Sequence, residues 1–242
     1  MRYWLVVLLI LTVISFAVPE LTYADHLASQ IEQGDYLSIK YIDVLEKTRS
    51  PLLAEGGRPI NLVVVQGKQD ATEVLPIINF HEGVPVFIVR QSGITKVKGT
   101  SSESDVSGYS MKIVNSEKIV VGSSGVPPQE FVFVKDLGAF VCSKSIAGRY
   151  VDGDGQSYEF KANGIAITPT TTFNFVIGTD HVPYRFDYLE DSITHQVYRF
   201  SREGCNLDIS EVLDAVENQH GNDGSHIRPF AKLREVGCKK TQ

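Results

Sequence analysis

An acidic, glycine-rich turn is the first segment whose residue types could do chemistry. Residues Asp152 to Gln156 read Asp-Gly-Asp-Gly-Gln, with Glu159 after them, so oxygen-bearing side chains alternate as a hard cation such as calcium requires. The third Asp or Asn, the sixth-position glycine and the twelfth-position glutamate of an EF-hand are missing. Between two strands the same residues form a hairpin turn, in which glycine supplies positive φ. We therefore expect a turn and assign no metal ligand and no cofactor.

The chain has six histidines, and two sets of them have neighbours that could begin a metal site. His81 precedes Glu82, and His220 and His226 flank Asp223 in a polar, glycine-rich segment. A surface loop accounts for that segment more simply, and the His-Glu-x-x-His pattern of a zinc protease does not occur. We assign none of these histidines as a metal ligand. The other three are His26, His181 and His195.

Local motifs for nucleophilic catalysis and phosphate binding do not occur in the sequence. The Gly-x-Ser-x-Gly elbow of hydrolases is missing, and Gly122 to Gly125 is one residue too short for it. No glycine-rich tract ends in Gly-Lys-Ser or Gly-Lys-Thr before a helix. A Ser, His and Asp triad can still be assembled in space, so a hydrolase remains an alternative. We assign no catalytic residue and favour a non-enzymatic protein.

The N-terminus carries the pattern of an export signal. Arg2 precedes an apolar run of about 15 residues, from Trp4 to Val18, shorter than the roughly 20 that a membrane-spanning helix needs. Pro19 follows the run, and the small residues Thr22 and Ala24 fit cleavage after Ala24. We expect residues 1–24 to be a signal peptide, which leaves no stable membrane span after cleavage. An uncleaved membrane anchor is the alternative. A cleaved chain would be periplasmic or secreted.

Composition and charge exclude several classes of protein. The 242-residue chain is 43% hydrophobic and 21% charged, which is typical of a globular protein and not of a disordered polymer or a multi-span membrane protein. Its formal net charge is −6. Because nucleic-acid binding requires clustered positive charge, no nucleic-acid partner is expected.

Three cysteines are present: Cys142, Cys205 and Cys238. In an oxidising compartment two of them should form a disulfide, and three pairings are possible. If residues 148–151 are the first strand of a module and residues 232–236 the last, antiparallel closure brings Cys142 near Cys238. We therefore favour a Cys142–Cys238 disulfide, with Cys205–Cys238 as the next alternative. Under the favoured pairing Cys205 would be a buried apolar residue or an intermolecular link.

Residues 25–58 are the predicted helical segment. Asp35 can cap a helix, and the helix must end before Pro51, because a residue that precedes proline is pushed out of helical geometry. The apolar positions recur at helical spacing: Leu37, Tyr41, Val44 and Leu45.

From residue 59 onward, short apolar runs alternate with turn residues. Runs of four to seven residues rich in Val, Ile, Phe, Tyr and Thr are typical of antiparallel strands, and no helix long enough for a βαβ crossover separates them. We predict a mostly β fold: antiparallel meander modules, barrel or sandwich, at 59–140 and 141–242, with an N-terminal helix and an exposed loop at 99–108. Residues 210–219 fit a helix or a strand. The predicted strands are 60–65, 76–80, 84–90, 94–98, 109–114, 118–121, 131–134, 140–143, 148–151, 157–161, 165–168, 172–177, 184–188, 196–201, 206–210 and 232–236.

A weak internal repeat links the two predicted modules. The segment from Phe80 to Ile94 is similar to that from Tyr150 to Ile165, at an offset of 70 or 71 residues. Each copy has an aromatic strand, an acidic-Gly turn, a second strand and an x-Gly hairpin. Either the modules are duplicates, or the pattern of a β-hairpin simply recurs.

The second module resembles a small lipocalin-like barrel of the kind found in secreted proteins. Gly148-Arg149-Tyr150 is similar to the glycine–x–tryptophan signature that opens the lipocalin barrel, and the resemblance covers the segment from Ile146 to Val236. It implies a β-barrel that holds a ligand or binds a partner. It carries over no ligand-binding residue.

These observations lead to an exported, non-enzymatic β-protein that binds a small apolar ligand or a partner protein. The alternatives are a structural or inhibitory module that docks on another exported protein through an exposed edge or the 99–108 loop, and a hydrolase with a spatially assembled site. A closed apolar cavity would favour a small ligand, and a filled core with an exposed apolar patch would favour docking. A histidine and a carboxylate that converge on a serine in a cleft would favour the hydrolase.

Overall fold

The computed structural model describes residues 31–56, 60–68, 71–78, 80, 82–83, 86–90, 93–97, 110–123, 125–181, 184–213 and 227–238. No helix within these ranges has the length and apolar character to span a membrane. The predicted signal peptide (residues 1–24) and the predicted loop at 99–108 lie outside the described residues. The same holds for His26, His81, His220 and His226.

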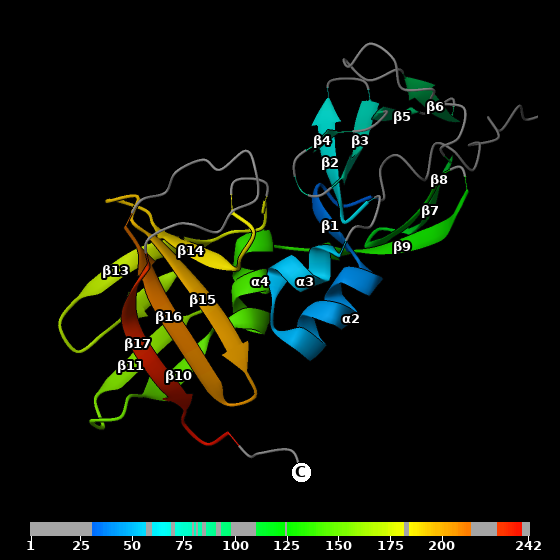
Figure 1. The fold of residues 1–242 in the computed structure, drawn as a ribbon. Coiled ribbons are helices and arrows are strands. Elements are labelled where there is room, and N and C mark those ends of the chain that lie inside the picture. Colours follow the sequence, from blue (N-terminus) through cyan, green and yellow to red (C-terminus); the bar gives the residue numbers. More distant parts are fainter. Residues whose placement is uncertain are drawn as a thin grey trace, which may run out of the picture.

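The described residues form two antiparallel sheets and three helices, so the predicted mostly β, antiparallel fold is confirmed (Figure 1). The first sheet has nine strands in the order β6-β5-β3-β2-β1-β9-β8-β7, with β4 paired to β3. These strands are β1 (Gly34–Ser38), β2 (Leu62–Lys68), β3 (Ala71–Ile78), β4 (Glu82–Gly83), β5 (Val86–Arg90), β6 (Gly93–Val97), β7 (Ser110–Asn115), β8 (Lys118–Ser123) and β9 (Val126–Val134).

The second sheet is a closed barrel in which each strand pairs with the next one along the chain and β10 pairs with the last strand, β17. An eight-stranded, closed antiparallel barrel is compatible with the lipocalin-like architecture expected for this module. Three of the predicted strands, 148–151, 157–161 and 172–177, coincide with β10, β11 and β13. The barrel strands are β10 (Gly148–Val151), β11 (Ser157–Lys161), β12 (Ile165–Ile167), β13 (Thr172–Ile177), β14 (Tyr188–Asp191), β15 (Val197–Glu203), β16 (Asn206–Val212) and β17 (Ile227–Glu235).

The predicted N-terminal helix begins later than expected. Residues 34–38 form β1, which lies between β2 and β9 in the sheet, and α2 occupies Ile39–Thr48. Tyr36 and Leu37 are both buried but belong to separate apolar clusters, so neighbouring side chains point to opposite faces, as they do in a strand. The spacing from Leu37 to Tyr41 resembles that of a helix because β1 is short and buried on both faces, so its polar and apolar residues do not alternate.

The predicted end of this helix before Pro51 is confirmed. Arg49 has a left-handed conformation at φ 57°, and Ser50 is extended. Pro51 then begins a second helix, α3 (Pro51–Glu55), in which the Ser50 side chain accepts a hydrogen bond from the Leu53 N–H. Proline is favoured at the first helical position because no helical hydrogen bond is lost there.

A third helix, α4 (Leu137–Ser145), replaces the strand predicted at 140–143. Asp136 caps it, with its Oδ1 atom accepting the Ala139 N–H at 2.8 Å. A short apolar run fits a buried helix as well as a strand, and the capping aspartate is the signal that distinguishes them here. The predicted boundary between the modules, at residues 140 and 141, falls within this helix. In the described part of 210–219, β16 continues to Val212, so the strand alternative holds there.

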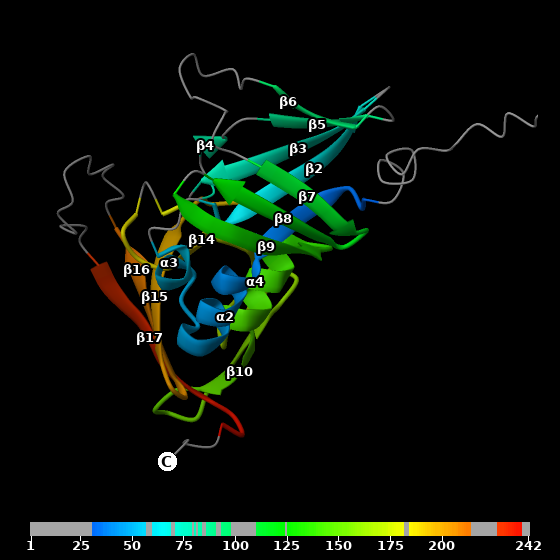
Figure 2. The same ribbon diagram turned by 90° about the vertical axis from the view of Figure 1, so that its right-hand side faces the viewer.

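The helices lie between the barrel and the nine-stranded sheet (Figures 1 and 2). One apolar cluster runs from the sheet through the helices into the barrel: it includes Leu37 and Val134 of the sheet, Leu45 of α2, Val141 of α4 and Phe200 of the barrel. A second cluster lies on the opposite face of the sheet and contains Tyr36, Val63, Phe87, Ile113 and Phe131. The first cluster therefore joins the two modules through a shared core.

The internal repeat corresponds to hairpins and not to modules. The β5–β6 hairpin in the first copy matches the β11–β12 hairpin in the second. The sheets that contain them differ, because one is an open path of nine strands and the other a closed barrel. This difference favours a recurring hairpin pattern over duplication of a module.

Candidate functional site

The acidic segment at residues 152–156 is a hairpin turn, as predicted. The Asp152 Oδ1 atom accepts hydrogen bonds from the backbone N–H groups of Asp154 at 3.0 Å and Gln156 at 2.9 Å. Gly155 has φ 79°, which suits glycine. Within the part of the chain that the structure describes, no cluster of three or more His, Cys, Asp or Glu residues could hold a metal ion.

The favoured Cys142–Cys238 disulfide is wrong: the structure pairs Cys205 with Cys238, with a Cα–Cα distance of 5.7 Å. Cys205 lies in the β15–β16 turn, and β17 ends beside the start of β16, where Glu235 donates its N–H to the Cys205 carbonyl. The neighbouring strands β16 and β17 therefore bring these two cysteines together. Cys205 comes just before the predicted strand 206–210, and Cys238 comes just after the predicted strand 232–236. Antiparallel pairing of these two strands would therefore have predicted this disulfide.

Cys142 is buried on α4 and unpaired among the described cysteines. Its thiol donates to the Lys161 carbonyl at 3.4 Å. Burial raises the pKa of this thiol to about 12, so it stays protonated at neutral pH.

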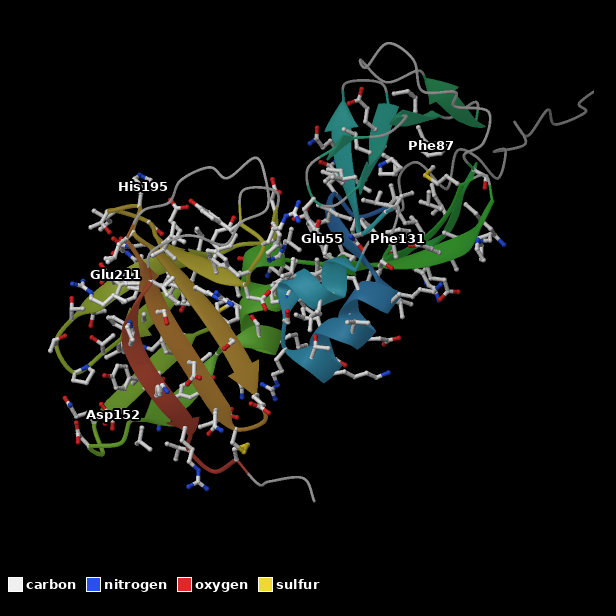
Figure 3. The ribbon with its side chains drawn as sticks, in the orientation of Figure 1. Glu55, Phe87, Phe131, Asp152, His195 and Glu211 are labelled. Atoms are coloured by element: carbon white, nitrogen blue, oxygen red, sulfur yellow. A yellow bond between two sulfur atoms is a disulfide. The ribbon has the colours of Figure 1, made fainter. Side chains whose placement is uncertain are left out.

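The barrel has two ends. At the helix end, α4 leads into β10. At the outer end the 192–196 turn meets the last residue of β16, because the Gln196 side chain donates to the Val212 carbonyl, and Val212 pairs with Ile227, the first residue of β17. Figure 3 shows the labelled Asp152, His195 and Glu211 on the side of the barrel that faces away from the helices.

Arg202 closes the helix end of the barrel. Its side chain is only 2% exposed and forms an ion pair with Glu235. One guanidinium nitrogen donates to the Ser145 carbonyl at 3.0 Å and to the Tyr150 hydroxyl at 2.7 Å, and the guanidinium lies over the Tyr150 ring. Burial raises the pKa of Tyr150 to about 12. The tyrosine of the Gly148-Arg149-Tyr150 tripeptide is therefore fixed beneath a buried charge that the sequence analysis missed.

Arg202 could have been found from strand alternation. Tyr198 and Phe200 precede it at intervals of two on β15, and the three side chains share one face of that strand. A charged residue on an otherwise apolar inward face indicates a buried ion pair.

A row of aromatic rings in contact runs through the barrel from Tyr150, at the helix end, to Phe230. The ring centroids are separated by 5.9 Å for Tyr150–Phe160, 6.1 Å for Phe160–Phe175, 6.5 Å for Phe175–Phe173, 5.7 Å for Phe173–Tyr198 and 5.2 Å for Tyr198–Phe230. The last three rings come from β13, β15 and β17, which are not neighbours in the barrel. Their contacts therefore cross the interior.

Apolar side chains gather at the outer end where this row of rings reaches the surface. Ile193 is 75% exposed, Leu213 49%, Ile227 46% and Phe230 38%. The first lies in the β14–β15 turn, and the others lie at or near the facing ends of β16 and β17. An ion pair between Arg228 and Glu211 lies beside them. This group of four residues is called the outer apolar rim below.

Depressions lined by described residues are open to solvent. One of about 230 Å³ lies between α4 and the β11–β12 turn, with Cys142, Gly164 and Phe175 in its lining. Two others, of about 530 Å³ and 510 Å³, lie against the outside of the barrel wall.

A buried histidine joins the helices to the barrel. His181, whose side chain is 2% exposed, places Nδ1 2.8 Å from Glu55 Oε2 and Nε2 3.6 Å from Asp187 Oδ1. Glu55 is the last residue of α3, whereas His181 and Asp187 belong to the β13–β14 connection (residues 178–187, described except for 182 and 183). Asp187 Oδ1 also accepts the Leu52 N–H at 2.7 Å, so α3 and the connection are linked twice.

Polar groups around this histidine are buried and incompletely paired. His181 Nε2, the Tyr41 hydroxyl and Asn61 Oδ1 have no hydrogen-bond partner among the described residues. Burial raises the pKa of Glu55, although the hydrogen bond from His181 opposes the shift, and burial likewise raises the pKa of Tyr41. Glu55 and His181 are 126 positions apart in the sequence, so no motif spacing could have revealed the cluster.

Comparison of the chain with protein-family models, with curated proteins and with solved structures found no match. The class that the fold defines is therefore a mostly β protein with an eight-stranded antiparallel barrel and a nine-stranded sheet.

Proposed function

We propose that this is an exported, non-enzymatic binding protein that docks an exported partner protein through the outer apolar rim. The observation that carries the proposal is the row of rings, which crosses the barrel and ends at Phe230 among three other exposed apolar residues. Single exposed apolar side chains are common on soluble proteins, but a group of them at one end of a fold is typical of an interaction site.

The row of rings packed inside the barrel favours a partner protein over a small apolar ligand. Barrels that carry ligands keep an apolar cavity of a few hundred Å³ into which the ligand is buried. In this barrel Phe160, Phe175 and Phe173 pack against one another in the apolar core. A partner side chain needs only the exposed surface of Phe230 and its neighbours.

Export is supported by two independent observations. The N-terminal sequence has the pattern of a signal peptide. The Cys205–Cys238 disulfide is consistent with an oxidising compartment, because disulfides are rare where thiols are kept reduced. We therefore place the proposed partner in the periplasm or outside the cell.

The hydrolase alternative has less support. His181 does meet two carboxylates, but its side chain is 2% exposed, and its Nε2 atom has no hydrogen-bond partner among the described residues. A general base must lie within reach of a nucleophile and of substrate. The histidine fits a structural role better.

Native mass spectrometry of the protein purified from its own organism tests the proposal. We expect a bound mass of protein size in the wild type. The substitution Phe230→Ser should weaken that complex by a factor of about 30 or more, since truncation of an aromatic anchor costs about 2 kcal/mol.

Val176→Ser is the matched control, because Val176 is 56% exposed on β13 but lies outside the outer apolar rim. It should leave the complex intact. A bound small molecule in place of a protein would overturn the proposal in favour of a ligand carrier. A protein complex that survives Phe230→Ser would place the interface elsewhere.

A further inference from the structure

The contact between α3 and the β13–β14 connection depends on a ring whose two nitrogens both face carboxylates. His181 Nδ1 lies 2.8 Å from Glu55, and Nε2 lies 3.6 Å from Asp187. The carboxylates are themselves largely buried, with side chains 12% and 10% exposed.

The number of protons on this ring decides how many of those carboxylates it can satisfy. A neutral imidazole has one N–H and one lone pair, so it donates to a single carboxylate, whereas the imidazolium donates on both sides. A buried carboxylate without a donor or an opposite charge is strongly unfavourable. The charged ring therefore suits this arrangement better than the neutral ring does.

We propose that Glu55, His181 and Asp187 form a proton-dependent latch between the N-terminal helices and the barrel. With both ring protons present, His181 bridges α3 and the connection. When one proton leaves, a bare nitrogen faces a carboxylate, and the ring has one N–H for the two carboxylates. The contact between α3 and the β13–β14 connection then weakens. The Leu52 N–H, which donates to Asp187, exchanges more readily with solvent as a result.

The titratable groups around the ring and its two carboxylates come from four elements. They are Glu55 on α3, Asp180 and Asp187 on the connection, Tyr41 on α2 and Tyr188 on β14. Burial raises the pKa of Tyr188 to about 12, and burial raises that of Tyr41, so neither tyrosine ionises near neutral pH. Burial also raises the pKa of Glu55, so the test must separate Glu55 from His181.

Amide hydrogen exchange at Leu52 measures the latch directly. In the full-length protein we expect the protection factor of this amide to fall about tenfold as the pH rises through the interval in which the ring loses its second proton. In His181→Gln the side chain can still donate but cannot titrate, so the protection factor should be nearly constant.

His195→Gln is the matched control. His195 also contacts a glutamate, with Nδ1 2.7 Å from Glu190 Oε1, but its side chain is 76% exposed. This variant should show the pH dependence of the wild type, because an exposed pair contributes little. The control also shows whether a change in net charge alone alters the exchange.

Two results would overturn the latch. One is a wild-type protection factor that does not change with pH, and the other is a pH dependence that persists in His181→Gln, which would assign it to Glu55. A measurement without any variant guards against a misfolded mutant: the ring C–H resonances of His181 should shift over the same pH interval as the Leu52 protection. If they shift over a different interval, the assignment to His181 fails.

Discussion

Arg202 is a buried charge whose partners surround it. Its guanidinium contacts Glu235, the Ser145 carbonyl and the Tyr150 hydroxyl and ring, although its Nε has no partner among the described residues. Removal of one member of such a group leaves the others buried without a partner, which costs more than the contact itself contributes. The helix end of the barrel therefore depends on this single side chain.

Arg202→Met should lower the free energy of unfolding by about 3 kcal/mol, because it leaves the Glu235 carboxylate without its ion-pair partner and next to an apolar side chain. Arg228→Met is the matched change at an exposed pair, where Arg228 is 63% exposed opposite Glu211, and it should cost below about 1 kcal/mol. Urea denaturation of both variants provides the measurement. Equal losses would contradict the role given to burial.

The thiol of Cys142 should be inert in the folded protein. Its burial and its raised pKa of about 12 keep it protonated and inaccessible. Without a reductant, a thiol-specific reagent should label almost nothing in the native protein and one thiol per chain in denaturant. Cys142→Ala should then show no thiol under either condition, and two or more thiols in the denatured wild type would contradict the Cys205–Cys238 disulfide.

At the level of elements, the sequence predicted most strands and missed those that break the usual patterns. Residues 157–161 and 172–177 are bounded by turn residues, and both form strands with the predicted limits. The strand β1 was missed because both of its faces are buried, and α4 because a short apolar run fits two structures. Local pattern failed where tertiary packing decides the outcome.

The β11–β12 turn requires glycine for two reasons that can be separated. Gly164 has φ 77°, and a Cβ atom there would lie 2.4 Å from the Phe175 carbonyl oxygen. Gly155 has nearly the same φ, 79°, but a Cβ there would meet nothing within 4 Å. Gly155→Ala should lower the free energy of unfolding by about 1 kcal/mol, because of φ alone. Gly164→Ala should lower it by about 2 kcal/mol more, because of the additional clash. Thermal unfolding of the pair gives the difference, and similar losses would refute the steric contribution.

The β14–β15 turn should show the opposite pH dependence from the latch. Burial alone would raise the pKa of Asp191, but hydrogen bonds from the N–H groups of Ile193 and Thr194 outweigh it and lower the pKa below 3.8. The ionised Asp191 therefore stabilises the turn above its ordinary pKa, and this contribution is lost as the pH falls through the lowered value.

Asp191→Asn should cost about 1 kcal/mol at neutral pH, since hydrogen bonds to a charged acceptor are lost. The difference from the wild type should shrink as the pH falls through the lowered pKa of Asp191, because the wild-type carboxyl then becomes protonated too. Denaturant titrations at several pH values provide the measurement. A difference that stays constant down to the lowest pH would show that charge has no part in this turn.

At the scale of the whole molecule, the two modules share one core and should lose structure together. Leu45 of α2 is fully buried in the cluster that runs from the nine-stranded sheet into the barrel, whereas Val121 of β8 belongs only to the cluster on the other face of the sheet. The sequence located α2 approximately but not α4, and it could not show that the helices join the two modules. The joint depends on contacts between residues far apart in the chain.

Leu45→Ala should lower the free energy of unfolding by about 3 kcal/mol and raise amide exchange in both β2 and β16. Val121→Ala should act mainly on the nine-stranded sheet and leave β16 close to the wild type. Hydrogen exchange followed by mass spectrometry distinguishes the two patterns. Exchange confined to one module in Leu45→Ala would mean that the modules unfold separately.

The Cys205–Cys238 disulfide also fixes which pieces of the chain remain together after cleavage. The two cysteines enclose the end of the barrel sequence, including β16 and β17. A protease that cuts any bond between them produces two polypeptides that are still joined by a covalent bond. Such a nicked protein would migrate as one species without a reductant and as two with it, and β17 would keep its place between β16 and β10.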